Sequence, residues 1–156
     1  MGNYVCNHCG GVVLACAKAH NEAVLKLFPS SVLVSDDIPS IPREYLQQAI
    51  DSLHSPAGSV MLSASSIDAM LKDKGYKEGS LNSRIDKAAD NHLITSEMAK
   101  WAHQVRLDAN DQRHADDSVL LPTEEDAQRV IDFSLAFAQY LFVLPSMVHK
   151  GINHPK

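Results

Sequence analysis

The sequence is organised around one polar stretch, Trp101-Ala-His-Gln-Val-Arg-Leu-Asp-Ala-Asn-Asp-Gln-Arg-His114. An α-helix turns about 100° per residue, so a helix wound from Met98 gathers apolar side chains on one side. These are Met98, Trp101, Ala102, Val105 and Ala109. A second sector, roughly 80° wide, follows the edge of that stripe and contains His103, Arg106, Asn110 and His114. We therefore expect these polar groups where a packed face meets solvent. If the helix ends near Ala109, Asn110 and His114 lie in a loop close to Arg106.

The polar sector contains groups suited to acid–base chemistry on an anion. Arg106 is a permanent cation with a planar set of donors for phosphate or carboxylate. His114 titrates near neutrality and is the candidate for proton transfer, with His103 as an accessory candidate. Asn110 can hold an oxygen or fix an imidazole tautomer. Such a set suffices for metal-independent RNA cleavage. The alternative is structural, with Arg106 and Asn110 capping helix ends and pairing with nearby aspartates while the histidines are solvated.

The segment Arg106-Leu-Asp-Ala-Asn110-Asp-Gln-Arg-His114 resembles the Arg-x-x-Gly-Asn-x-x-x-His signature of a bacterial family of domains of unknown function. That family belongs to the HEPN superfamily of small helical domains and is often found beside restriction and defence genes. The resemblance covers nearly the whole chain and includes an N-terminal Cys-x-x-Cys. Its further segments are Pro29, Ile38-Pro39, Gly75-Tyr76, Gly79-Ser-Leu81, Ile94 to Trp101 and Tyr140-Leu-Phe-Val-Leu-Pro145.

The resemblance implies an all-α fold and a homodimer. Many HEPN domains contain an Arg-x(4–6)-His motif, and the active ones are metal-independent endoribonucleases whose site forms across the dimer. In this chain seven residues separate Arg106 from His114, and Ala109 stands in place of the signature glycine. On an earlier helix, Ala64 replaces an arginine that the family often has, and Asp68 replaces a glutamate.

Two functions follow from these patterns. The first is a HEPN-like helical module of bacterial defence or restriction type, which dimerises and binds a partner, either RNA or a restriction or defence protein. The alternative is a metal-independent endoribonuclease at the dimer interface. In that alternative, Arg106 holds the scissile phosphate, His114 transfers the proton and Asn110 orients them.

The composition is that of one soluble domain. The chain has 156 residues, of which 45% are hydrophobic and 21% charged, enough for a single core. The net charge of −5 argues against a general electrostatic binder of nucleic acid but not against a local basic site. We expect no signal segment, because the first residues show no basic stretch followed by an apolar one. Gln139 and Pro145 interrupt the apolar run Leu135 to Val148, so we expect no membrane span. Three cysteines do not make a disulfide framework, which favours a cytoplasmic location.

The N-terminal Tyr4-Val-Cys-Asn-His-Cys-Gly-Gly11 predicts a zinc knuckle. Cys6 and Cys9 supply half of a tetrahedral site, and Cys16 with His20 supplies the second half, with His8 as a competing ligand. Four protein ligands would make Zn2+ a structural ion. The alternatives are a reduced surface pair with Cys16 buried as a small apolar residue, or a redox pair, although no βαβ pattern surrounds it.

The apolar periodicity and the helix signals of the remaining chain predict an all-α bundle of about four or five helices. We expect a knuckle segment over 1–28, an extended linker over 29–41, a helical domain over 42–146 and a loose tail over 147–156. From Val12 to Phe28 the pattern fits either a short strand plus a helix or one Ala-rich helix. Helix signals lie at Pro42, Ser55-Pro56, Ser80, Ile94-Thr95-Ser96 and Thr123-Glu-Glu-Asp126, and stop signals at Lys74-Gly75 and Pro145.

Overall fold

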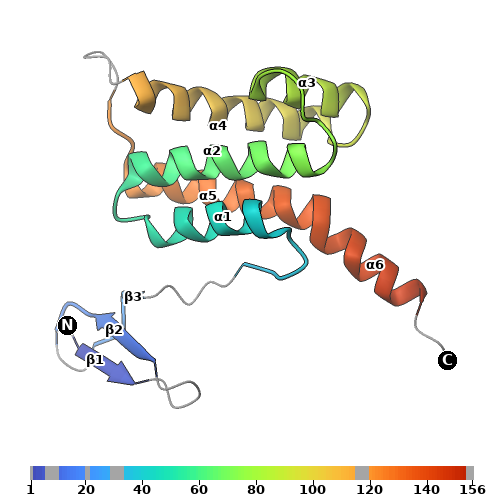
Figure 1. Cartoon of the computed structure of the whole chain (residues 1–156). Coiled ribbons are helices and arrows are strands. Elements are labelled where there is room, and N and C mark those ends of the chain that lie inside the picture. Colours follow the sequence, from blue (N-terminus) through green and yellow to red (C-terminus); the bar gives the residue numbers. More distant parts are fainter. Residues whose placement is uncertain (1, 6–10, 20–21, 29–33, 115–119, 154–156) are drawn as a thin grey trace. The chain divides into compact units, whose positions relative to one another are not determined.

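The computed structural model describes residues 2–5, 11–19, 22–28, 34–114 and 120–153. The chain divides into two compact units, Met1–Leu33 and Val34–Lys156. The first contains a three-stranded antiparallel sheet in the order β1-β2-β3 (Figure 1). Its strands are β1 (Gly2–Val5), β2 (Val12–Cys16) and β3 (Lys26–Phe28). The ambiguous stretch after Val12 therefore forms two strands, and no helix is found between them in the residues that the structure describes.

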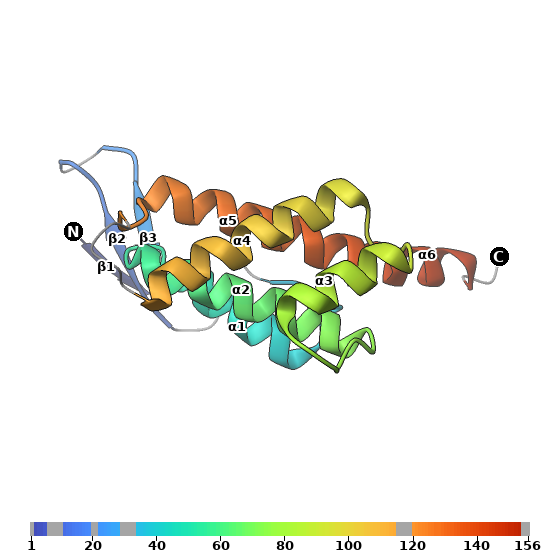
Figure 2. The ribbon, with the colours of Figure 1, turned by 90° about the horizontal axis from the view of Figure 1, so that it is seen from above.

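The second unit is mostly helical, as the sequence predicted. Figure 1 shows α2 and α5 in the middle of the bundle, with α1 on one side and α3 and α4 on the other. Figure 2, which is seen from above, shows α3 and α4 beside each other. The bounds are α1 (Ser40–Asp51), α2 (Pro56–Asp73), α3 (Leu81–Asp90), α4 (Ser96–His114), α5 (Glu124–Ala138), the π-helix η1 (Gln139–Val143) and α6 (Leu144–Ile152).

The helix boundaries follow from local chemistry that is visible in the sequence. The Ser80 side chain accepts a hydrogen bond from the Ser83 amide at the start of α3. At the start of α5, Thr123 Oγ1 accepts from the Asp126 amide while Asp126 Oδ2 accepts from the Thr123 amide, which is a capping box. Gly75 has a φ of +99° just after α2, a conformation that glycine adopts without strain. These predicted boundaries are confirmed.

The end of the last helix differs from the sequence prediction. Pro145 does not stop the helix, and residues 147–152 are helical instead of a loose tail. A proline removes one amide donor and clashes with the carbonyl four residues earlier, which here belongs to Leu141. The π-turn η1 ends at Val143, two residues before Pro145, and its wider hydrogen-bond pattern lets the helix continue past the ring.

As a result, Glu124–Ile152 forms one uninterrupted helix of 29 residues. By length and composition alone it is apolar enough to cross a membrane. That is weak evidence, because the core helix of a soluble bundle passes the same test. Its first part, α5, buries Phe133 and Phe137 in the bundle core, so the structure is compatible with a soluble protein.

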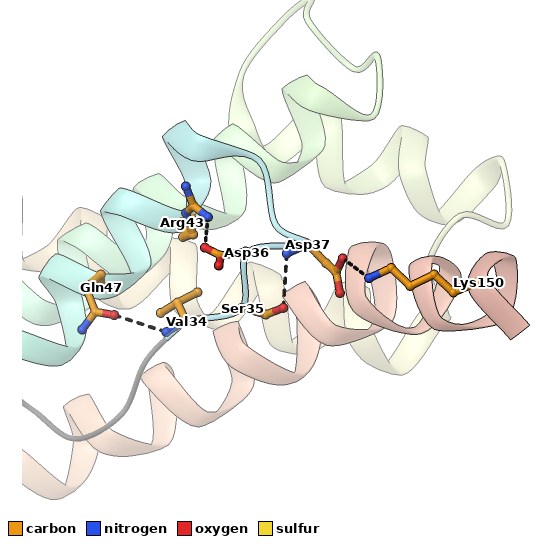
Figure 3. A network of polar contacts seen from close by, with 7 residues as sticks. All are labelled: Val34, Ser35, Asp36, Asp37, Arg43, Gln47 and Lys150. Carbon is orange, nitrogen blue, oxygen red and sulfur yellow. Dashed lines mark hydrogen bonds and ion pairs between the residues drawn. The ribbon is translucent and has the colours of Figure 1, made fainter. Parts of the chain in front are cut away.

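The segment before α1 is part of the helical unit, since Val34 and Ile38 are buried in its core. Figure 3 shows the polar contacts that tie this segment to its neighbours. The Asp37 carboxylate accepts hydrogen bonds from Lys150 Nζ and Ser146 Oγ, both at 2.8 Å. These two donors, of which Lys150 has the larger effect, hold the pKa of Asp37 below its ordinary value of 3.8.

We expect the Asp37 contact to fix α6 at neutral pH and to be lost in acid. The pKa of Asp37 is lower in the folded state than its ordinary value of 3.8. The contact therefore stabilises the fold at pH values above 3.8, and this stabilisation is lost as the pH falls through the lowered pKa. An NMR titration of the α6 amide signals should show this transition in the wild type and not in Asp37→Asn. Identical titrations of the two proteins would contradict the expectation.

Candidate functional site

The candidate site lies on α4, a single helix that runs through to His114. The Thr95 side chain accepts a hydrogen bond from the Met98 amide and begins the helix as predicted. Ala99, Ala102, Val105 and Ala109 form the buried face, and their small size permits close packing against α2. The alternative in which the helix ends near Ala109 is excluded.

Trp101 lies at the edge of the buried face and not inside it. Its ring stacks on Phe133 of α5 with centroids 4.7 Å apart, while 49% of the residue remains exposed. The sequence placed Trp101 in the apolar stripe, but helical periodicity cannot tell the centre of a stripe from its edge. The exposed half is apolar surface that the fold leaves uncovered.

The four predicted polar residues share one flank of α4 but occupy different environments. Arg106 is half-buried, and its Nε is buried without a hydrogen-bond partner. Asn110 and His114 are exposed. Eight residues along a helix span about 12 Å, so Arg106 and His114 are two turns apart. A proton-transfer group and a phosphate-holding group must both approach the same reacting atoms within about 3 Å. Within one chain, these two residues do not form a compact pair.

His103 has a structural partner. Its Nε2 lies 3.0 Å from Asp86 Oδ1 of α3, and the two helices run side by side (Figure 2). This contact links α3 to α4 and orients the imidazole toward a carboxylate. His103 is therefore a bridging residue between helices, as well as the accessory candidate that the sequence suggested.

Two of the cavities that α4 helps to line bear on the candidate site. The larger, of about 690 Å³, lies toward α5 and includes Trp101, Asp108 and Asp111 in its lining. The second, of about 410 Å³, is lined by residues of α1, α2, α3 and the last turn of α4. Its lining includes Arg84 of α3 and Arg113 of α4. Within the described part of the chain, neither cavity is lined by Arg106, Asn110 or His114.

Sequence reasoning missed Arg84 and Arg113. Arg113 follows Arg106 by seven residues and hence lies on the same side of the helix, two turns along. That spacing was a usable signal, but no periodicity within α4 could indicate that Arg84, from another helix, lies against the same cavity.

A family model described as Domain of unknown function (DUF4145) matches residues 47–154. The chain belongs to the DUF4145 family. No curated protein and no solved structure matches it. The match begins inside α1 and extends beyond α6, so the DUF4145 domain comprises most of the helical unit, and the N-terminal strands lie outside it.

The predicted zinc ligands precede the DUF4145 match, and three of them, Cys6, Cys9 and His20, lie outside the described residues. Cys16 is the last residue of β2 and is a free, half-buried thiol. Val5, directly before Cys6, pairs with Val12 at the opposite end of β2. The ligand set of Cys6, Cys9, Cys16 and His20 therefore stays a prediction.

We expect zinc content to test this ligand set. Cys6→Ser and Cys16→Ser should each lower the zinc bound per chain, because three remaining ligands hold the metal less well than four. Elemental analysis of the purified proteins measures this content. Unchanged zinc in Cys16→Ser would contradict Cys16 as a ligand. Chelator should affect the N-terminal segment and leave the helical circular dichroism intact.

Proposed function

We propose that this DUF4145 chain is a HEPN-like helical module that forms a homodimer and binds a partner in a bacterial restriction or defence setting. The observation behind this proposal is an exposed apolar surface at one end of the bundle. Met98, Trp101, Phe133 and Tyr140 line an open cavity of about 390 Å³ there. Contiguous apolar surface of this kind is typical of interaction sites.

The helix α6 extends this surface. Figure 1 shows it projecting away from the other helices, and none of its residues is buried. Its apolar side chains recur at helical spacing and are exposed by 43 to 76%: Leu144, Met147, Val148 and Ile152. A second copy of the chain can place its α6 against the open apolar cavity of about 390 Å³. The α6 of the first copy then lies against the same cavity of the second copy, which gives a closed two-fold dimer.

Mass measurement in solution tests the dimer. We expect the wild type to be dimeric, and Met147→Glu and Ile152→Glu to be monomeric and folded, because each places a charge on the apolar side of α6. The matched control is Leu107→Glu at an exposed apolar position on α4 (43%), which should remain dimeric. A monomeric wild type at about 100 µM, far above the Kd of a stable dimer, would contradict the proposal.

One observation keeps the endoribonuclease as a second candidate. A purely structural arginine is normally held by a carboxylate, but Arg106 has no ion pair among the described residues, and its Nε is unpartnered. The 12 Å separation from His114 is compatible with a site only if the two residues come from different chains.

RNA cleavage in excess chelator separates the two functions. We expect no RNA cleavage by the folded wild-type dimer. The Arg106→Ala and His114→Ala variants, measured in parallel, should also show none. Circular dichroism must show that the helices survive the chelator. Cleavage that persists in chelator and disappears in both variants would establish the endoribonuclease in place of the non-catalytic module.

A further inference from the structure

The cavity of about 690 Å³ is lined by one side of α4, the segment 120–123 and the first turns of α5, and we call it the α4–α5 groove. Its lining follows α4 from Trp101 to Gln112 at helical spacing. The stretch from Trp101 to Asp111 rises by about 15 Å, which matches about ten residues of a helix or about five of an extended chain. The groove is therefore long enough for a short peptide segment.

Two leucines in the lining of the groove are apolar surface that the fold leaves uncovered. Leu120 is 91% exposed and Leu121 is 78% exposed. Their backbone is restrained, because a residue before a proline is confined to extended conformations and Thr123, after Pro122, forms the capping box of α5. Together with the exposed half of Trp101, the leucines form an apolar surface that is already ordered for a partner.

The carboxylates of the groove are compensated only in part. Asp126 pairs with Arg129 and accepts the hydrogen bonds of the capping box, so its charge is balanced locally. Asp108 accepts one hydrogen bond, at 2.8 Å, from the neutral side-chain amide of Gln104. Asp111 has no ion pair within the part of the chain that the structure describes. The negative charges of Asp108 and Asp111 are therefore available to a partner.

These two carboxylates reinforce each other as a site for cations. Asp108 and Asp111 are three residues apart on α4, so they are neighbours on one flank of the helix and their like charges repel. A cationic side chain beside them removes that repulsion. Because Asp108 is half-buried, its attraction to a cation is screened less by water and salt than at a fully exposed position.

The combination of charge and apolar surface decides which occupant fits. A second copy of the chain has a net charge of −5 and is a poor match for an acidic groove, and a nucleic acid is repelled by it. A small polycation would satisfy the carboxylates but leave the leucines exposed. A protein segment with both basic and apolar side chains matches both parts of the surface.

We propose that the α4–α5 groove binds a basic segment of a partner protein. Two arginine or lysine side chains of that segment pair with Asp108 and Asp111, while an apolar side chain packs against Leu121 and Trp101. This inference rests on the proposed function, because it names the chemistry of the partner that the helical module binds. Trp101 also lines the apolar cavity of the proposed dimer, so the test uses residues that line the groove and not that cavity.

Selection from a displayed library of random peptides of about ten residues, on the full chain, provides the probe. We expect the selected peptides to share two basic residues and a nearby apolar one. Fluorescence anisotropy then measures the binding of the strongest peptide. Asp108→Asn and Asp111→Lys should each weaken it by about tenfold or more, since hydrogen bonds between charged groups are the stronger kind. Leu121→Ser should weaken it by about tenfold through lost apolar contact.

The matched control for the charge is Asp132→Asn on α5. Gln128 donates to Asp132 at 2.8 Å, as Gln104 does to Asp108, but Asp132 does not line the groove. This variant should bind the peptide like the wild type. It separates a specific site from the general attraction of a negatively charged protein for basic peptides.

Three results would overturn the proposal: selected peptides without basic residues, no selected peptide at all, or equal loss of binding in Asp108→Asn and Asp132→Asn. A dimeric wild type that becomes monomeric in Asp111→Lys would also overturn it, because the groove would then be a contact between copies. Solution mass is measured on the same samples. A dimer that binds no basic peptide contradicts the groove alone, whereas a monomeric wild type that binds the peptide contradicts the dimer and supports the groove.

Discussion

Phe137→Ala is expected to lower the free energy of unfolding by about 3–5 kcal/mol, the range for a large aromatic side chain deleted from a core. Phe137 lies in α5 and is fully buried, at 0% exposed. Its ring centroid is 5.6 Å from that of Phe133, which stacks in turn on Trp101. The substitution therefore removes both buried area and one member of an aromatic row that joins α5 to α4.

Urea unfolding monitored by circular dichroism measures this loss, at more than one protein concentration because dimerisation adds to apparent stability. Leu107→Ala is the matched control on an exposed face and should change stability by no more than about 0.5 kcal/mol. A loss below about 1 kcal/mol for Phe137→Ala would mean that the aromatic row is not packed in solution as described.

The helical part of the fold was predictable because helix boundaries depend on neighbouring residues. Ser80 and Thr123 each satisfy backbone amides within one turn, so the signal lies entirely in local sequence. The passage of the last helix through Pro145 was not predictable in this way. The π-turn that permits it changes the hydrogen-bond pattern over five residues and is stable only where packing supports it.

The candidate site was predictable only in part, and for a related reason. Periodicity within one helix correctly grouped Arg106, Asn110 and His114 on one flank, but it does not say how far apart they lie along the axis or what faces them. The pairing of His103 with Asp86 and the meeting of Arg84 with Arg113 depend on how α3 packs on α4 and α2. Contacts between helices far apart in sequence leave no signal in the periodicity of either helix.

Asp68→Ala is expected to destabilise the helical unit by about 2–4 kcal/mol, somewhat less than the loss for a fully buried pair because Asp68 retains some exposure. The Arg84 side chain is 10% exposed and that of Asp68 is 21% exposed. Without the carboxylate, the guanidinium stays largely desolvated with the Lys77 carbonyl as its only remaining partner among the described residues. A buried charge that has lost its counter-ion is the costly state, more so than the absence of both charges.

A double-mutant cycle separates the ion pair from the packing of its side chains. Arg84→Met removes the charge and keeps an unbranched apolar chain of similar length, so the double variant Asp68→Ala with Arg84→Met should be more stable than the sum of the two single losses predicts, by about 1–3 kcal/mol. Unfolding by urea measures all four proteins. Additive losses would show that Arg84 and Asp68 do not interact in solution. In that case the losses would come from the packing of the two side chains and not from their charges.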